Sequence, residues 1–405
     1  MKSKLSIILG VLILTSCKSI EKTPQKITYK NFYKFNIEIE NDLKKDSLNP
    51  DYQYASTEYS LKGDQKNALR TLDLAFRQKV KTLSEKQKDS IENKINLLDA
   101  KDFILQKSID EKIIMLNEAH QSSLHRVFAE SLLQGLFDNG YKIFCVEALS
   151  NGKHKDTLLN SRKHPIQDTG FYTINPSFGN LLRTALKIGF KVLPYETTQQ
   201  IGDEIREADQ ANNIKNIINE FPNEKIFIYC GVGHSIEGNL DYWGGKSLAG
   251  RITELTGINP LTIDQFFYSE KSKPEYNNPL LNFMNFETPS VPVDINGLPI
   301  PFNEDDGWID IIVLHPKTNY VNNRPNWLVK SREHLVKIDL SKIKINYPIM
   351  VMAFKEGEDW IDGVPVDIQE VNIDDDVYLA LDKGIYNIVI SNLEGEHLRF
   401  TEKIS

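Results

Sequence analysis

The sequence predicts an α/β protein whose core is a mainly parallel sheet with helices on both faces. Between residues 111 and 335, short and continuously apolar runs alternate with helical stretches. This pattern is typical of a parallel sheet buried on both sides, because such strands are apolar along their whole length. An α-helical region precedes this α/β domain, and alternating runs over 336–405 predict a small antiparallel β-domain after it.

The first 17 residues have the features of a lipoprotein signal. Lys2 and Lys4 precede an apolar run over 5–14, which is too short for a membrane-spanning helix of about 20 residues. The run ends in "LTSC", which resembles a bacterial lipobox with Cys17 as the acylated residue; an ordinary signal peptide is the alternative. We therefore expect a protein of the bacterial cell envelope, anchored to a membrane by palmitate or a similar lipid at Cys17, with a polar tether over 18–30.

Charge and cysteine content narrow the class of protein. The formal net charge is −8, whereas a nucleic-acid-binding protein is expected to carry a basic face. Beyond Cys17 the chain contains only Cys145 and Cys230, each in or at the end of an apolar run. Two cysteines make no disulfide framework, so we expect both to be free and buried.

Residues 31–110 are predicted to be helical. Over 54–76, small and aromatic residues recur at spacings that suit two packed helices, with a turn at Gly63-Asp64. This stretch resembles one tetratricopeptide-type hairpin. About three such repeats are needed to form a stable array, so we expect the hairpin to pack on a neighbouring domain, and a protein or peptide partner remains an alternative. A further helix is predicted over 85–105.

The α/β domain is predicted to span 111–335. Four apolar strands (112–118, 141–147, 190–196 and 224–230) alternate with helices over 122–139, 177–189, 202–221 and 245–257. A later apolar run, 308–316, would close the sheet. The segment 268–306 contains six prolines and is predicted to be a long irregular loop of the kind that forms lids or binding loops.

The remaining residues, 336–405, show period-two alternation of apolar and polar side chains. Turn signals such as Asp382-Lys383-Gly384 separate the runs. This pattern predicts a sandwich-type β-domain. It contains no cluster of catalytic residue types, so an accessory role is expected.

Each of the four predicted strands leads directly into ionisable side chains. Ligands of open α/β sheets bind beyond the carboxyl ends of the strands, so these side chains are candidates for one converging site. A single polar strand end needs no functional explanation, because every strand must meet water somewhere. Four in succession favour a site. The candidates are Glu118 and His120, Glu147, Glu196, and His234 after Gly231-Val232-Gly233.

These residue types suit acid–base chemistry near neutral pH. Histidine exchanges protons in this range, and neighbouring carboxylates need a cation among them to stay ionised. Arg206, at the start of the following helix, is one candidate for that cation. A divalent metal held by His120, Glu147 and His234 is the other, since such ligands leave an open position for hydrolysis.

Other polar residues near the predicted site have weaker claims. His125 falls on a different helical face from His120, and His315 ends the last predicted strand. His154 and His164 lie in a polar segment that is expected to be a surface loop. Tyr195 is expected to point to the opposite face of its strand from Glu196.

Five stretches between residues 100 and 330 resemble the motifs of one known superfamily. "LNEAHQSSLHRVFAESLLQGLFDNGYKIFCVEAL" is similar to an opening strand–helix–strand unit in which both strands end in glutamate. "READQANNIKNII" resembles an arginine-led helix, and "KIFIYCGVGHSIEGN" a later strand that ends near a histidine. "GRITELTGINPLTIDQ" and "DGWIDIIVLHPKTNYVNNRPNWL" resemble the closing elements. In this order the motifs resemble the superfamily of erythromycin esterases, ChaN-like haem-uptake proteins and Tiki proteases.

The resemblance implies a membrane-anchored hydrolase of an ester or amide, with a small molecule or peptide as substrate. In the esterase branch the first-motif histidine activates water, which here is His120, with Glu118 and Glu147 in support. Arg206 and His234 would orient the substrate or stabilise an oxyanion. The alternative is a haem- or iron-binding lipoprotein, because the single residue between Glu118 and His120 is closer to the haem-uptake branch.

Overall fold

The computed structural model describes residues 24–76, 78–199, 202–239, 245–304 and 306–405. At its centre is a six-stranded sheet in the order β12-β8-β3-β6-β4-β5, in which every neighbouring pair is parallel. The strands are β3 (Ile113–Glu118), β4 (Tyr141–Val146), β5 (Lys191–Pro194), β6 (Lys225–Gly231), β8 (Leu261–Asp264) and β12 (Ile311–Ile312). The predicted parallel sheet is confirmed.

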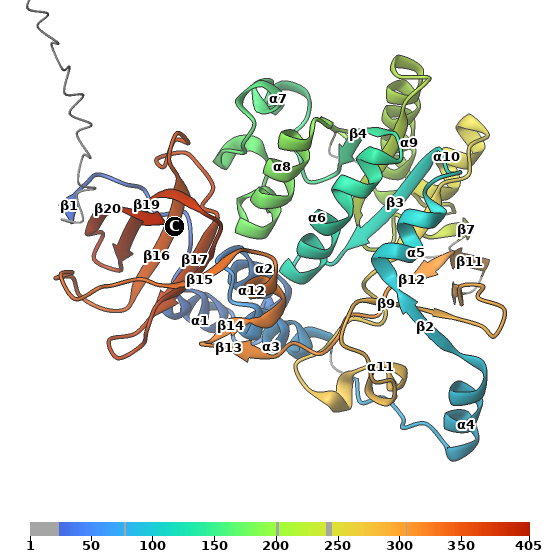
Figure 1. The fold of residues 1–405 in the computed structure, drawn as a ribbon, viewed down its shortest axis with the longest axis horizontal. Helices are drawn as coiled ribbons and strands as arrows, with labels where there is room; N and C mark the ends of the chain where they lie inside the picture. The colour runs from blue at the N-terminus through green and yellow to red at the C-terminus, as the bar shows by residue number, and fades with distance from the viewer. Residues whose placement is uncertain (1–23, 77, 200–201, 240–244, 305) are drawn as a thin grey trace, which may run out of the picture.

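Helices flank this sheet, as Figure 1 shows. They are α5 (Ala100–Lys107), α6 (Ser123–Asp138), α7 (Leu159–Arg162), α8 (Pro176–Ile188), α9 (Asp203–Glu220) and α10 (Leu248–Thr256). Alternate residues of β3 face the two sides. Ile114 and Leu116 join a core with α5, α6 and α8, whereas Ile113 and Met115 join a second core with α9 and α10. Burial on both faces explains why the strands are apolar throughout.

Both predicted cysteines are free and buried within the parallel strands. Cys145 lies in β4 and Cys230 in β6, on the side of the sheet covered by α9 and α10. Burial raises the pKa of each thiol above its ordinary value. They therefore act as small apolar core residues.

Two parts of the sheet differ from the sequence-based expectation. The strand β8 was not predicted, because Thr262 and Asp264 interrupt its apolar residues. The run 308–316 does not form one strand, and divides at Asp310 into β11 (Asp306–Ile309) and β12. Asp310 Oδ2 accepts hydrogen bonds from the backbone and hydroxyl of Thr262. This leaves β12 parallel to β8, whereas β11 pairs antiparallel with β7 (Glu237–Asn239) and β10 (Phe302–Glu304).

The N-terminal region contains α1 (Asn36–Lys45), α2 (Tyr52–Leu61), α3 (Gln65–Phe76) and α4 (Glu85–Lys94). Ser56 Oγ donates to the Ala68 carbonyl at 2.7 Å, which joins α2 to α3. The single helix predicted over 85–105 is wrong. It is interrupted by β2 (Asn96–Asp99), which pairs with β9 (Ser290–Val293), and Asp99 then caps α5 by accepting from the Asp102 N–H.

The proline-rich segment 268–306 is mostly irregular, as predicted, but it is not without structure. It contains α11 (Pro279–Phe283) and the strands β9 and β10. Downstream, β13 (Tyr320–Val321) and β14 (Arg324–Pro325) form a hairpin before α12 (Asn326–Lys330).

The C-terminal region forms a five-stranded antiparallel sheet in the order β1-β20-β19-β16-β17, with a separate pair β15-β18 packed on it. Its strands are β15 (His334–Lys337), β16 (Ile349–Lys355), β17 (Asp367–Val371), β18 (Tyr378–Leu381), β19 (Gly384–Asn392) and β20 (His397–Ile404). Its edge strand, β1 (Gln25–Lys26), comes from the segment predicted as a tether. That prediction fails for these two residues, because they pair with β20.

The C-terminal sheet contacts both other regions. On one face, Tyr29, Tyr33 and Phe35 pack against Met350 and Met352. On α8, Arg183 pairs with Glu358 beyond β16. Figure 1 shows the C-terminal strands on the left, the parallel sheet on the right, and α1 to α3 below and between them.

The predicted signal and lipobox, including Cys17, lie outside the described residues. Within the described ranges, no helix is both long and apolar enough to cross a membrane.

Candidate active site at the carboxyl ends of the parallel strands

The register of the sheet brings the predicted strand ends together. Glu118, the last residue of β3, pairs with Gly231, the last residue of β6. Across the next pair, Val146 is level with Tyr229, and the Glu147 N–H donates to the Tyr229 carbonyl at 3.1 Å. Parallel strands therefore place these ends at one edge.

Two residues of α6 fix the loop that carries His120. His125 Nδ1 accepts from the Ala119 N–H at 3.0 Å, and Arg126 Nη2 donates to the His120 carbonyl at 2.6 Å. The loop is thus held from the helix that follows it. His125 therefore supports the loop from inside the protein, where it is fully buried.

Glu118 is buried and receives three partners. Arg126 Nε donates to Oε2 at 2.7 Å, and Tyr229 Oη donates to the same oxygen at 2.9 Å. His120 Nδ1 lies 3.1 Å from Oε1. Burial alone would raise the pKa of Glu118, but Arg126 and His120 lower it below its ordinary value. An ionised Glu118 accepts the Nδ1 proton of His120 and leaves the lone pair on Nε2.

The ring of His120 is held flat against Tyr172. The two rings are stacked with centroids 4.1 Å apart and 13° between their planes. Its Nε2 faces Gly231: a methyl group built on that glycine would lie 2.8 Å from Nε2 and 3.3 Å from Glu147 Oε2. The imidazole is therefore oriented by one hydrogen bond and one aromatic face, with its free nitrogen beside the end of β6.

Arg206 is the cation among the carboxylates. Its Nη2 pairs with Glu147 Oε1 at 2.5 Å and also with Glu196 Oε2, while Nε donates to Glu196 Oε1 at 3.1 Å. Gln210, one turn along α9, donates to both oxygens of Glu196. Burial alone would lower the pKa of Arg206. Glu196 and Glu147 outweigh this effect and raise the pKa above its ordinary value, so the guanidinium stays charged.

His234 lies behind Glu147. Its Nε2 is 3.2 Å from Glu147 Oε1 and its Nδ1 is 2.7 Å from Glu207 Oε1. Burial by itself lowers the pKa of His234, but the two carboxylates raise it to about 10. Both ring nitrogens of this imidazolium face carboxylates. His234 therefore holds Glu147 in place, whereas the sequence interpretation expected it to contact the substrate or an oxyanion.

Glu147 is strongly acidic in this setting. Burial would raise its pKa, but His234, His120 and Arg206 hold it well below the ordinary range. Its Oε2 also accepts from the Gly231 N–H. Glu147 is therefore a fixed negative charge rather than a base.

A cavity of about 470 Å³ opens over these groups. Five of the six predicted site residues line it, and Glu118 lies beneath His120. Leu149, Phe171 and Tyr172 form its apolar wall. The arrangement can place a polar, uncharged group between an oriented imidazole and a guanidinium.

The donor set does not fit the metal predicted at His120, Glu147 and His234. Within the described residues, no group of three or more His, Cys, Asp and Glu side chains is arranged to hold a metal ion. Glu147 Oε1 faces Arg206 and His234, and its Oε2 accepts from Gly231. Arg206 therefore occupies the position of the cation.

The other histidines considered from the sequence lie away from the cavity wall. His125 and His315 are buried and stacked on each other with centroids 5.4 Å apart, and burial lowers the pKa of both. His154 lines a neighbouring hollow that shares Ser150 and Phe171 with the site cavity. Tyr195 is buried in the core under α9.

Four residues of the site were missed by the sequence interpretation: Arg126, Tyr172, Tyr229 and Glu207. The arginine and the glutamate follow site residues closely in the sequence, Arg126 eight positions after Glu118 and Glu207 directly after Arg206. Tyr172 carried no signal, because it lies in a short 3₁₀-helix (Tyr172–Ile174) inside an irregular segment.

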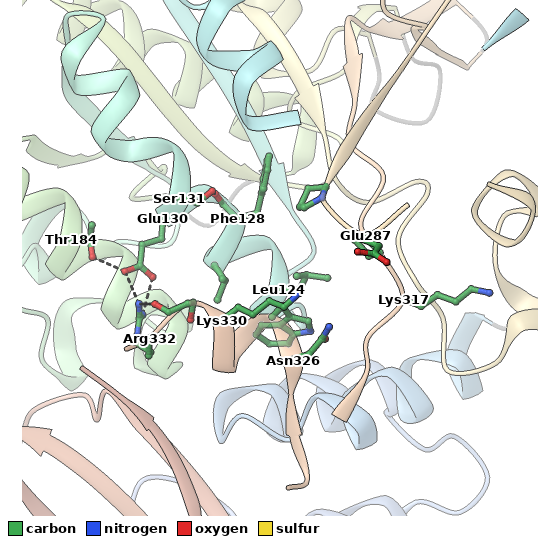
Figure 2. Close-up of a pocket in the computed structure, with 15 residues that line it drawn as sticks. Leu124, Phe128, Glu130, Ser131, Thr184, Glu287, Lys317, Asn326, Lys330 and Arg332 are labelled. Carbon is green, nitrogen blue, oxygen red and sulfur yellow. Dashed lines mark hydrogen bonds and ion pairs between the residues drawn. The ribbon is translucent and has the colours of Figure 1, made fainter. Parts of the chain in front are cut away.

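A second cavity, of about 430 Å³, lies between α6 and α12 (Figure 2). Two of its charged residues, Glu130 and Arg332, pair with each other at 2.9 Å. The hydroxyl of Thr184 donates to Glu130. Figure 2 shows these groups bonded to one another rather than aimed at an open space. This cavity has no acid–base set.

No family model matches this sequence, and no curated protein matches it. Among the solved structures that are similar to parts of it, three are each 12% identical to it. The type III effector HopBA1 has a TM-score of 0.32, covering 42% of this chain and 86% of that one. A chain from a structure of bacterial protein toxins has 0.31, covering 53% and 51%. The MARTX toxin effector domain RRSP from Vibrio vulnificus CMCP6 has 0.25, covering 53% and 49%. This chain thus spans about half the length of the latter two.

Proposed function

We propose that this protein is a hydrolase of an ester or amide, with His120 as the general base. The observation that carries the proposal is the orientation of His120: Nδ1 lies against the buried Glu118, the ring is stacked on Tyr172, and Nε2 borders the cavity. A base with one fixed tautomer and an accessible lone pair is what activation of water requires. The resemblance of residues 100–330 to the esterase superfamily also supports this proposal.

The reaction follows from these positions. His120 Nε2 takes a proton from water, and the hydroxide oxygen bonds to the substrate carbonyl carbon. The oxyanion that forms is stabilised by Arg206. Its Nη1 is not paired with a carboxylate among the described residues and lies 3.4 Å from His234 Nε2. When the intermediate collapses, the leaving oxygen or nitrogen takes the proton back from His120.

Haem binding, the alternative considered from the sequence, is less well supported by the cavity. Haem places a large apolar ring against its site, and one wall here is the cluster of Glu147, Glu196 and Arg206. Burying these charges under a macrocycle is costly. Titration with haemin tests the alternative directly, and a stoichiometric change in the visible spectrum would favour it over hydrolysis.

The test of the hydrolase uses a panel of chromogenic esters and anilides. We expect His120→Ala to lower turnover by about 100-fold or more while the near-ultraviolet circular dichroism stays native. His334→Ala, in β15 of the C-terminal region, is the matched control and should keep full activity. Equal turnover of the wild type and His120→Ala on a substrate that the wild type cleaves would overturn the assignment.

We also propose that the protein is anchored to a membrane of the bacterial envelope by lipid at Cys17. The support is the sequence of residues 1–17. Incorporation of labelled palmitate should be lost in Cys17→Ala and unchanged in Cys145→Ala. Label retained in Cys17→Ala would contradict the proposal.

A further inference from the structure

A further hollow, of about 420 Å³ and distinct from the cavity in Figure 2, adjoins the site cavity at His120. His120 and Val232 line both this hollow and the site cavity. Its remaining walls come from α2, α3, the segment after α3 and the segments that follow β3 and β8. A substrate whose reacting bond lies at His120 can therefore extend in this direction.

The cation of this hollow is Lys271. Lys271 Nζ stands over the ring of Phe266, 5.0 Å from its centroid. Within the described parts of the chain, no carboxylate or hydrogen-bond acceptor pairs with this Nζ. Burial lowers the pKa of Lys271, with Asp73 and Asp264 opposing that effect from a distance. A partly buried ammonium without an acceptor is costly unless a ligand supplies one.

The backbone around Lys271 is fixed on both sides. Asn277 Oδ1 accepts from the Lys271 N–H at 2.7 Å, and Asp73 Oδ2 accepts from the Ser272 N–H at 2.7 Å. Asp73 belongs to α3, so the helical region holds the loop in place. The lysine is thus presented by a braced loop rather than by a free surface segment.

The rest of the hollow combines apolar and amide groups with one carboxylate, Asp73, whose Oδ2 accepts from the Ser272 N–H. Leu72, Phe76 and Val80 contribute apolar surface, and Gln53 and Gln121 contribute neutral donors and acceptors. Apolar walls that lead to a single cation suit a short hydrocarbon arm ending in an oxyanion.

We propose that this hollow binds a carboxylate-terminated arm of the substrate, with Lys271 Nζ bonded to the carboxylate. The substrate class is then an ester or amide of a dicarboxylic acid or of a similar acid-bearing chain. This assignment rests on the proposed hydrolase function, because it places the reacting bond at His120.

The decisive experiment is titration calorimetry with glutarate as the probe. The wild-type protein should show saturable binding, which Lys271→Met should weaken by about 10- to 100-fold, the effect of losing one charge-assisted hydrogen bond. Lys271→Arg should restore most of it. Lys273→Met, an exposed lysine two residues away, should bind like the wild type. No saturable binding by the wild type, or equal binding by Lys271→Met, would overturn the proposal.

Turnover separates this proposal from the proposed function. The wild type should cleave the 4-nitrophenyl monoester of glutaric acid in preference to 4-nitrophenyl valerate, and Lys271→Met should lose that preference without losing valerate turnover. Glutarate binding that depends on Lys271, with no ester or amide cleaved, would leave the subsite intact and overturn the hydrolase. Preference for the glutaric monoester retained in Lys271→Met would overturn the subsite alone.

Discussion

His120 and Gly231 approach each other so closely that a side chain at position 231 would collide with the imidazole. A Cβ there would lie 2.8 Å from His120 Nε2 and 2.9 Å from its Cε1, which is closer than real contacts allow. The atoms that the added methyl group would meet belong to the side chain of His120, which can move, and not to the backbone. The imidazole would therefore be displaced while the strand stayed in place.

We predict that Gly231→Ala lowers turnover by about 100-fold, because a displacement of about 1 Å at a reacting group has effects of this size. Stability should change by about 1 kcal/mol or less, since the ring can give way. Steady-state kinetics and thermal unfolding measure the two effects. Gly202→Ala, where the added methyl meets nothing within 4 Å, is the control. Full activity in Gly231→Ala would show that the position of His120 is not critical.

His234 makes stability depend on pH in a defined direction. Its pKa is raised from 6.5 in the unfolded chain to about 10 by Glu147 and Glu207, against the opposing effect of burial and with Arg206 nearby. A raised pKa contributes stability that is fully present below pH 6.5 and is lost as the pH rises toward 10.

The prediction is that the free energy of unfolding of the wild type falls relative to that of His234→Gln between pH 6.5 and 10. The limiting slope is about 1.4 kcal/mol per pH unit for one proton. Urea unfolding at several pH values measures it, and the difference between the two proteins removes the contribution of other titrating groups. Parallel curves over this range would mean that His234 is neutral in the folded protein.

The residues of the site were predictable from the sequence where a strand ended in an ionisable group. Glu118, Glu147 and His234 were found in this way because buried strands exclude such side chains. Arg126 and Tyr229 were not, since an arginine on a helix or a tyrosine in a strand is ordinary in a sequence. Their importance arises only from burial against Glu118.

Among the elements, the apolar strands and the helices between them were predictable, and the interrupted ones were not. β3, β4 and β6 each have at least six residues, enough to show continuous apolarity. β8 is interrupted by Thr262 and Asp264, and β2 was hidden within a helical pattern because its neighbours are good helix formers. Pairing with β9 overrides the local preference there.

The element α8 connects the site to the rest of the protein. At its start, Asn175 Oδ1 accepts from the Phe178 N–H, while Nδ2 donates to the Ser60 carbonyl and to Ser123 Oγ. One side chain thus joins α8 to α2 and α6. Because Tyr172 lies three residues before Asn175, the same contacts position the ring that stacks on His120.

At the scale of the whole molecule, the C-terminal sheet is bonded to α8 through buried charges. Arg183 donates from Nε to Glu358 Oε1 at 2.9 Å and pairs through Nη2 with Oε2 at 2.6 Å. Asn180 Nδ2 donates to the Val366 carbonyl at 2.8 Å. An accessory sheet attached in this way would influence the site through α8 and Tyr172, although it contributes no residue to the cavity wall.

We predict that Arg183→Met destabilises the protein by about 3–5 kcal/mol, because it leaves Glu358 partly buried without its partner. It should also lower turnover, since the segment that leads into α8 carries Tyr172. Calorimetry should show a single transition in both proteins, because the two regions share buried contacts. Lys337→Met removes one side of an exposed pair with Asp376 on the same C-terminal region and should leave stability close to that of the wild type, because exposed pairs are screened by water. Two separate transitions, with only the one at lower temperature shifted by Arg183→Met and with turnover unchanged, would show that the sheet folds and acts independently of the site.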